Sequence, residues 1–383
     1  MRFSGVVPVL IVYRCICALL QQTAFAPDEF WQGPEVAHRL VFGYGHVTWE
    51  WVVGIRSYVH PLMYAVVYQL LRWAGMDGWR WVMLRGPQMV HVMLTVWADI
   101  SVYKLTRVYL EDEGVAVLAL VCQLLNWFGS YCLVRTFSNS VEACLTAYAL
   151  YAYAICLKNG KKQGSRVAHD TARYTVYWVF CAALCVVLRP ASGVFWGILA
   201  VYSVVFNRGR RVLHIMTGLL VGCLVLFAAS SIDRWMYGRW ELVPWNFFKF
   251  NVLSDGSSLY GVNPWHANFS THLPSMLLSY IPFFLLGCIT CMRQGRWHLV
   301  GACVLYCVVY SIPAHKEIRF LLPALIMCMP VTALGLKQFL ANRAHGYTYT
   351  IMFSLQLTAF AYFSLLHQRY VVIVFYVCDV SCF

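Results

Sequence analysis

The chain has 383 residues, of which 61% are hydrophobic and only 12% are charged, and its formal net charge is +13. Soluble domains average roughly 45–50% apolar residues, so this composition excludes an ordinary soluble protein and indicates a polytopic membrane protein. The basic residues fall in short clusters between apolar runs, a distribution that sets membrane orientation and argues against nucleic acid as a partner.

The chain opens with Arg2 followed by an apolar stretch, a pattern shared by cleaved signal peptides and by retained signal anchors. Because many further apolar runs follow, we interpret it as an uncleaved first span. Candidate spans number about eleven, some of them short, and they predict an all-α polytopic bundle of about eleven transmembrane helices. They lie near 5–25, 82–105, 114–134, 140–157, 174–188, 191–206, 212–231, 274–291, 298–314, 320–337 and 348–366.

Loop charge predicts the orientation of these spans. Alternating spans place the basic loops at 158–166, 207–211, 293–296 and 337–343 on one side, which is the cytosolic side by the positive-inside rule. The same alternation places residues 135–140, 188–192, 232–273 and "HKEIRF" on the opposite side. The first loop lies on that side too only if the run 58–74 does not cross the membrane. We therefore predict that 58–74 is a juxtamembrane helix, with a first loop at 26–81 and a second at 232–273.

The first loop concentrates ionisable and aromatic side chains. It contains Asp28, Glu29, Glu35, His38, Arg39, His46, Trp49, Glu50, Trp51, Arg56 and Ser57. Carboxylates and indole rings contact sugars, while guanidinium groups bind phosphate through forked hydrogen bonds. The alternative is a solvated loop whose tryptophans belong to the aromatic belt of the membrane. Because the rest of the chain is so poor in charge, we interpret the loop as a binding pocket.

Several motifs together resemble a known family. "PDEFWQGPEVAHRLVFGYGHVTWEW", "IRSYVHP", "RTFSNSVE", "NFFKFN", "LYGVNPWHANF" and "HKEIRFLLP" occur in order between about residue 5 and residue 369. They resemble the lumenal glycosyltransferases of the GT-C superfamily, and most closely the GPI mannosyltransferase III family. "HKEIRF" alone is shared with dolichol-pathway mannosyltransferases, whereas the forms "LYGVNPWHANF" and "PDEFWQGPEVAHR" resemble more narrowly the third GPI mannosyltransferase.

The resemblance implies a GT-C-type bundle in the endoplasmic reticulum membrane, multi-pass, with a lumenal active site and a lumenal first loop. It implies inverting transfer of an α-1,2-linked mannose from dolichyl-phosphate mannose to the second mannose of a GPI glycolipid precursor. The partners are then this donor, the GPI acceptor and the membrane lipids. No cofactor and no metal ion are expected, and the sequence has no GxGxxG fingerprint of a nucleotide-sugar domain.

Alternative functions stay open at this point. A sister enzyme acting on the N-glycan precursor or adding the fourth GPI mannose has similar motifs, and a catalytically inactive relative is another interpretation. A lipid transporter places its polar groups within the membrane. The polar groups of this chain lie instead at loop and span ends on one side.

The expected reaction needs one base that deprotonates the acceptor hydroxyl. Asp28 matches the acidic position of the family motif, with Glu29 as the alternative. Asp28 also suits the N-cap of a following helix, which is the structural interpretation of the same residue.

The expected leaving group is a lipid phosphate, so we predict cations where it rests. His315, Lys316 and Arg319 are the first candidates and Arg56 and Arg135 the second, while a self-paired snorkelling anchor is the alternative. Asn139 and Glu142, which follow Arg135 at the start of a predicted helix, suit the wall of the same cavity. We assign no role to Arg189.

The sugar or acceptor contacts are predicted at Glu35, His38, Trp49, Glu50, Trp265 and His266. Glu35 and His38 are three residues apart and share a helix face with Arg39, so a surface ion pair is the alternative. For the tryptophans the alternative is aromatic anchoring. Asn268 lies in the glycosylation sequon "NFS", but its closeness to the next span argues against occupancy.

The C-terminal residues depart from the family pattern. Residues 370–383, "YVVIVFYVCDVSCF", are apolar and do not resemble the expected continuation. We expect residues 1–369 to form the glycosyltransferase domain and 370–383 to be an atypical apolar tail.

Overall fold

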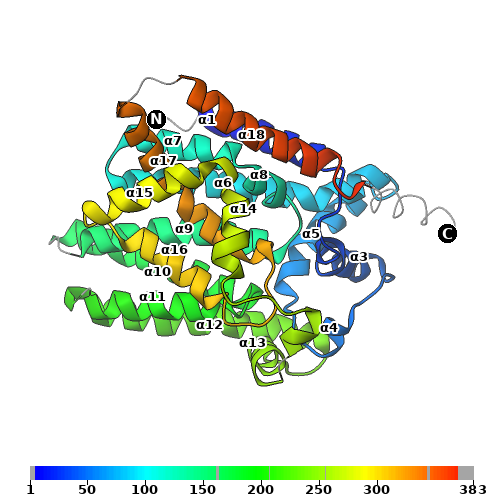
Figure 1. The fold of residues 1–383 in the computed structure, drawn as a ribbon. Coiled ribbons are helices and arrows are strands. Elements are labelled where there is room, and N and C mark those ends of the chain that lie inside the picture. Colours follow the sequence, from blue (N-terminus) through cyan, green and yellow to red (C-terminus); the bar gives the residue numbers. More distant parts are fainter. Residues whose placement is uncertain (1–4, 161–163, 207, 255, 343–345, 370–383) are drawn as a thin grey trace.

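The structure is a computed structural model that describes residues 5–160, 164–206, 208–254, 256–342 and 346–369. The predicted tail at 370–383 lies outside these residues. The described chain is helical and contains no strand (Figure 1). Its α-helices are α1 (Val6–Leu20), α2 (Asp28–Trp31), α3 (Pro34–Phe42), α4 (Trp49–Val52), α5 (Val59–Trp73), α6 (Arg80–Leu110), α7 (Glu113–Leu125), α8 (Trp127–Cys132), α9 (Ser138–Asn159), α10 (Ser165–Leu188), α11 (Ser192–Phe206), α12 (Arg211–Tyr237), α13 (Val243–Phe248), α14 (Leu273–Leu277), α15 (Ile281–Arg293), α16 (His298–Val309), α17 (Leu322–Asn342) and α18 (Gly346–Leu365).

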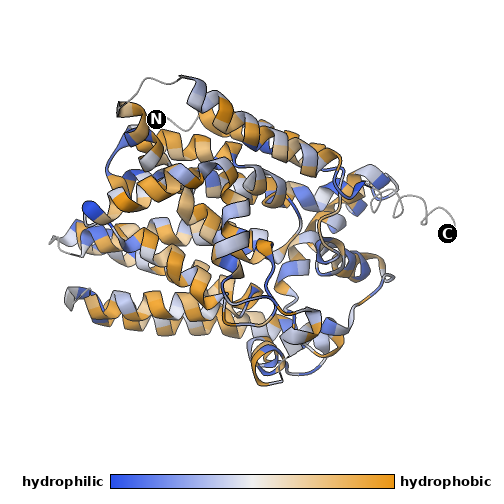
Figure 2. Ribbon diagram, in the orientation of Figure 1, coloured by the Kyte–Doolittle hydropathy of each residue, from blue (hydrophilic) through white to orange (hydrophobic). Residues whose placement is uncertain are grey.

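The long helices form one bundle with an apolar exterior. Helix α9 packs against α6 and α10, and α17 packs against α15, α7 and α16, so that α9 and α17 form the centre. Figure 2 shows hydrophobic residues along most of these helices and hydrophilic residues gathered at the helix ends and connections. Five described segments are long and apolar enough to cross a membrane, and four shorter helices are also apolar. Every segment predicted as a span is helical, whereas the number of crossings stays a prediction.

The polar loops assemble at one end of the bundle. Helices α3, α4, α5 and α13 lie together at the right-hand end in Figure 1. The predicted juxtamembrane segment forms α5, which packs against α3 and α6. Helix α12 runs to Tyr237, six residues into the predicted second loop, and ends where Gly238 adopts a left-handed φ of 70°. Glycine suits this position because it carries no Cβ.

The first and last described helices meet beside this end. The backbone amide of Gln22 donates to the carbonyl of Ser364, and the Thr23 hydroxyl donates to the carbonyl of Phe363 at 2.6 Å. The Gln21 amide nitrogen lies 3.1 Å from the Ser364 hydroxyl. The segment that leads into the first loop is therefore fixed to the end of α18.

Helices α15 and α17 cross at two glycines. A Cβ added at Gly335 lies 2.0 Å from the carbonyl oxygen of Phe283, and one added at Gly287 lies 1.9 Å from the carbonyl oxygen of Val331. In membranes, small residues stabilise helix pairs because they let the two backbones approach. This crossing therefore has no room for even one methyl group.

We expect Gly335→Ala to lower the free energy of unfolding by about 1–3 kcal/mol, because the added methyl forces the two helices apart. The measurement is thermal unfolding of the purified protein in detergent. Gly222→Ala is the matched control, since a Cβ at Gly222 in α12 meets nothing within 4 Å. Equal unfolding temperatures for the two variants would contradict this account of the crossing.

Candidate active site

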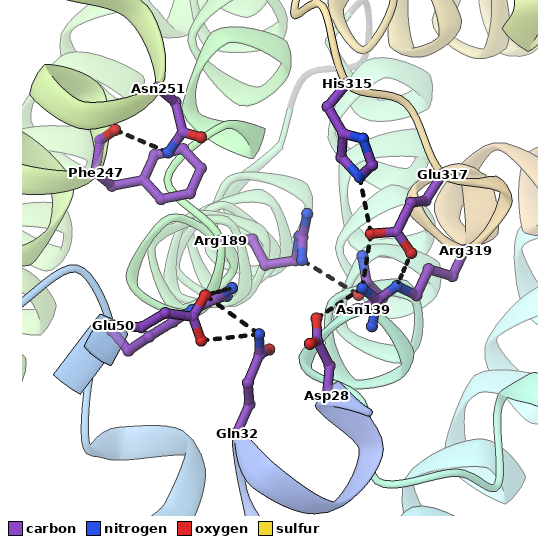
Figure 3. A network of polar contacts seen from close by, with 11 residues as sticks. Asp28, Gln32, Glu50, Asn139, Arg189, Phe247, Asn251, His315, Glu317 and Arg319 are labelled. Atoms are coloured by element: carbon purple, nitrogen blue, oxygen red, sulfur yellow. Dashed lines mark hydrogen bonds and ion pairs between the residues drawn. The ribbon is translucent and has the colours of Figure 1, made fainter. Parts of the chain in front are cut away.

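Arg319 links the two motifs that the sequence singled out. Its Nη2 donates to Oδ2 of Asp28 at 2.6 Å, and its Nε and Nη2 donate to the two oxygens of Glu317 at 2.6 and 2.8 Å (Figure 3). The side chain of Arg319 is 5% exposed, whereas that of Asp28 is 31% exposed. The structure therefore joins the start of the first loop to "HKEIRF" at one partly open point.

The local backbone explains how these side chains meet. Asp28 is the first residue of the one-turn helix α2, and the residue at the N-cap position is Pro27, with no side-chain cap. Asp28 therefore does not cap this helix, which removes the structural interpretation considered from the sequence. Glu317 is extended, and a 3₁₀ turn at Ile318–Leu321 then leads into α17. Arg319 lies in this turn.

The remaining residues of "HKEIRF" differ in their partners. His315 Nε2 lies 3.1 Å from Oε1 of Glu317. Burial tends to raise the pKa of Glu317, but the charge and hydrogen bonds of Arg319 outweigh it, so that this pKa is lowered and the carboxylate stays ionised. Lys316 is 5% exposed, and its Nζ donates to the carbonyls of Pro313 and Asn263 at 2.7 and 3.2 Å. Lys316 thus holds the second loop against the site.

Glu29 and Arg135 form a buried pair. Arg135 Nη1 donates to Oε2 of Glu29 at 2.7 Å, and the same guanidinium donates to the side chain of Gln21 and to the carbonyl of Thr23. Both side chains are almost completely buried. The Thr136 hydroxyl also donates to the backbone carbonyl of Glu29. The pair therefore fixes α2 against the connection between α8 and α9.

Arg56 and Glu50 form a second pair near the site. Arg56 Nη2 donates to Oε1 of Glu50 at 2.8 Å. Figure 3 shows Gln32 directed toward Glu50, and Nε2 of Gln32 donates to Oε2 of Glu50 at 3.1 Å. This network connects α2 to α4. The sequence did not indicate Gln32, because it lies 18 positions before Glu50 and no helical periodicity relates two residues so far apart.

The predicted contacts on α3 lie outside these networks. Glu35 accepts a hydrogen bond from the backbone amide of His46 at 2.8 Å. His38 Nδ1 lies 3.4 Å from the carbonyl of Tyr44. Arg39 donates to the carbonyl of Gly45. These three side chains thus hold the turn that follows α3, and the sugar-binding role of Glu35 and His38 stays a prediction.

The predicted tryptophans are open to the surroundings. Trp49 is partly exposed, and its ring centroid lies 5.1 Å from that of Phe250. Trp265 is 73% exposed and packs edge-on against His266, whose Nδ1 lies 2.9 Å from the Ser270 hydroxyl. Their assignment to the acceptor also stays a prediction. Among the described residues, no group of three His, Cys, Asp or Glu side chains is placed to hold a metal ion.

A further buried cluster contains Arg189, to which the sequence analysis gave no role. Arg189 Nη1 donates to Oδ1 of Asn139 at 3.2 Å, and its Nε lies 3.4 Å from Oε2 of Glu142. The hydroxyls of Tyr306 and Tyr310 donate to Oε1 of Glu142 at 2.9 and 3.0 Å. Figure 3 shows Arg189 and Asn139 directed toward the space that Asp28 and Arg319 border.

We expect the sequon at Asn268 to be unmodified. The Asn268 side chain is buried, donates to the Ser311 hydroxyl at 3.1 Å and lies 3.0 Å from Nδ1 of His272. Attachment of a glycan requires this amide to be exposed. The measurement is the electrophoretic mobility of the cell-expressed protein before and after treatment with an amidase that removes N-glycans. A shift in mobility that Asn268→Gln abolishes would contradict the placement.

The fold is shared with known membrane enzymes. It matches the crystal structure of ArnT from Cupriavidus metallidurans bound to undecaprenyl phosphate with a TM-score of 0.66, at 14% identity, covering 92% of this chain and 62% of that chain. It also matches the archaeal oligosaccharyltransferase AglB from Archaeoglobus fulgidus, with a TM-score of 0.53 at 13% identity, covering 97% and 56%. These likenesses show that the chain shares its fold with the two solved structures, and the predicted all-α bundle is confirmed.

The sequence places the chain more narrowly. Residues 6–378 match the model of the Alg9-like mannosyltransferase family, and the chain belongs to that family. It is 36% identical to GPI alpha-1,2-mannosyltransferase 3 of Xenopus laevis over 83% of this chain, and 34% identical to the Homo sapiens protein of that name over 94%. It is 39% identical to mannosyltransferase APTG1 of Arabidopsis thaliana over 82%. The aligned parts make up 57%, 62% and 55% of these three relatives.

Proposed function

We propose that the chain is an inverting mannosyltransferase of GPI-anchor biosynthesis in the endoplasmic reticulum. Its donor is dolichyl-phosphate mannose, and its acceptor is the 2-hydroxyl of the second mannose of the GPI precursor. The product then carries the third, α-1,2-linked mannose. The family match and the names of the relatives support this function over the N-glycan precursor, the fourth GPI mannose and lipid transport as alternatives.

The observation that carries the mechanism is the pairing of Asp28 with Arg319 at 2.6 Å. An inverting transfer needs a base on the attacking side of the sugar carbon and cations near the leaving phosphate. Asp28 is partly exposed and Arg319 is buried beside it, so one ion pair supplies both kinds of group. On this proposal Arg319 faces the donor phosphate while Asp28 faces the acceptor hydroxyl.

The chemical step balances with these residues alone. Asp28 takes the proton of the acceptor hydroxyl while the oxygen of that hydroxyl forms a bond to C1 of the mannose. The bond between C1 and the phosphate oxygen breaks, and its electron pair leaves with dolichyl phosphate. Arg319 stabilises the negative charge that grows on that phosphate. His315 lies near Arg319, because both side chains contact Oε1 of Glu317.

The surroundings favour Asp28 over Glu29 as the base. Glu29 is buried and bound to Arg135, which removes it from an acceptor hydroxyl. Arg135 is likewise saturated by protein oxygens, so we assign it to positioning α2 rather than to the phosphate. Trp49, Glu50, Trp265 and His266 are assigned to the sugars, and the reaction is assigned to the lumenal side.

The test is mass spectrometry of GPI precursors in cells that lack the third GPI mannosyltransferase. Expression of this chain is expected to convert the two-mannose precursor to three-mannose forms, and Asp28→Asn is expected to leave it unconverted. Persistence of the two-mannose precursor despite a well-expressed chain in the endoplasmic reticulum would contradict the proposal for this chain.

A further inference from the structure

Two guanidinium groups flank one aromatic ring beside the site. The Cζ atom of Arg189 lies 4.6 Å from the centroid of the Phe320 ring, and the Cζ atom of Arg319 lies 5.7 Å from the same centroid. Arg319 reaches Asp28 and Glu317, whereas Arg189 reaches Asn139 on α9 (Figure 3). Both cations therefore lie close to the Phe320 ring.

The Arg189 cluster contains unsatisfied polar atoms. Among the described residues, Arg189 Nε, Asn139 Nδ2 and Glu142 Oε2 are buried and have no aligned hydrogen-bond partner. The contact of 3.4 Å between Arg189 Nε and Glu142 is too poorly aligned to count as one. Arg189 Nε and Asn139 Nδ2 are donors and Glu142 Oε2 is an acceptor. Buried polar atoms without partners are costly, and the two free donors can bind an oxygen of a ligand.

Other buried arginines in the chain differ from Arg189. Arg14 donates from Nε and Nη2 to both oxygens of Asp99 and from Nη1 to Ser130. Arg135 donates from Nε, Nη1 and Nη2 to surrounding oxygens. The guanidinium group of Arg189 makes a single aligned hydrogen bond among the described residues. The fold thus uses Arg14 and Arg135 fully, whereas Arg189 keeps donor capacity.

We propose that Arg189, oriented by Asn139, forms with Arg319 a two-arginine site for the phosphate of a lipid-linked substrate. Forked guanidinium donors match phosphate oxygens, and the shared contact with Phe320 brings the two arginines near each other. The Tyr306 and Tyr310 hydroxyls donate to Oε1 of Glu142, so this oxygen already has protein partners. The assignment rests on the proposed function, and the phosphate belongs either to the dolichyl donor or to the glycolipid acceptor.

The experiment is direct binding to the purified full chain in lipid nanodiscs. The probes are radiolabelled dolichyl phosphate and, separately, a radiolabelled two-mannose GPI precursor. Arg189→Gln is expected to weaken binding of dolichyl phosphate about tenfold or more, as the loss of a charge-assisted hydrogen bond predicts. Arg189→Lys, which keeps the charge without the fork, is expected to weaken it less. Asn139→Asp is a second test, because it keeps the side-chain volume and offsets the charge of Arg189.

The control is Arg14→Gln, which removes a buried, paired arginine away from the site. It is expected to lower the unfolding temperature and to leave binding of dolichyl phosphate by the folded fraction unchanged. Weakened binding of the GPI precursor alone would support the site and assign it to the acceptor phosphate. Unchanged binding of both probes in Arg189→Gln and Asn139→Asp would overturn the inference. If the wild type binds dolichyl phosphate but transfers no mannose, the proposed function fails while the phosphate site stands.

Discussion

Asp28→Asn is expected to abolish mannose transfer while the protein stays folded. The asparagine side chain keeps the shape of aspartate and still offers an oxygen to Arg319, but it cannot accept the proton of the acceptor hydroxyl. Positioned general bases contribute roughly 10²–10⁴-fold to rates, so the loss of turnover should fall in that range or beyond. The measurement is transfer of labelled mannose from dolichyl-phosphate mannose to a GPI precursor by the purified protein.

The chain offers a matched control for this substitution at Asp112. Asp112 lies 2.6 Å from Lys337 of α17, as Asp28 lies 2.6 Å from Arg319 just before the same helix. Asp112→Asn removes one carboxylate from one ion pair, and asparagine keeps the N-cap of α7. We expect it to retain transfer activity. Wild-type rates in Asp28→Asn, measured beside this control, would refute Asp28 as the base.

The second large effect is expected for Arg319→Ala. Removal of this guanidinium deletes the cation assigned to the donor phosphate, and one such electrostatic group is commonly worth roughly 10²–10³-fold in rate. It also leaves Glu317 and Asp28 without their common partner. Breaking a buried pair lowers the free energy of unfolding by about 3–5 kcal/mol, and the loss is smaller here because both carboxylates are partly exposed. Activity and thermal stability should therefore both fall.

A double variant separates these two losses. In Arg319→Ala with Glu317→Gln, no unpaired carboxylate remains at position 317, so the unfolding temperature should recover in part. Transfer activity should not recover, because the cation is still missing. If activity returns together with stability, Arg319 acts only as a structural partner of Glu317 and its role toward the phosphate is wrong.

The sequence was sufficient for the fold class and for the motifs that border the site. Long apolar runs set the helices, and the charge of "PDE" and "HKEIRF" in a chain so poor in charge marked both segments. The contact between Asp28 and Arg319 was not predictable from spacing, because 291 residues separate them. Only the tertiary fold, which sets Asp28 of α2 beside the 3₁₀ turn that precedes α17, brings the two motifs together.

The contacts of Arg135 and Arg189 could not be predicted from the sequence, for different physical reasons. Arg135 looks like a phosphate ligand in sequence, but its burial with Glu29 gives it protein oxygens instead. Arg189 precedes a proline at a helix end, where no periodic pattern joins it to Asn139 on another helix. Side-chain contacts between different helices depend on how the whole bundle packs, so they cannot be read from the sequence around either residue.

The contact between the first and last described helices has a consequence for synthesis of the protein. Thr23 and Gln21 bind Arg135 and are themselves bound to Phe363 and Ser364, and Arg135 in turn fixes Glu29 next to Asp28. A ribosome delivers residues 363–364 more than 300 residues after residues 21–29. The proposed catalytic end is therefore completed only after nearly the whole described chain has been translated and inserted, so a nascent chain lacks these contacts while its later helices are still being made.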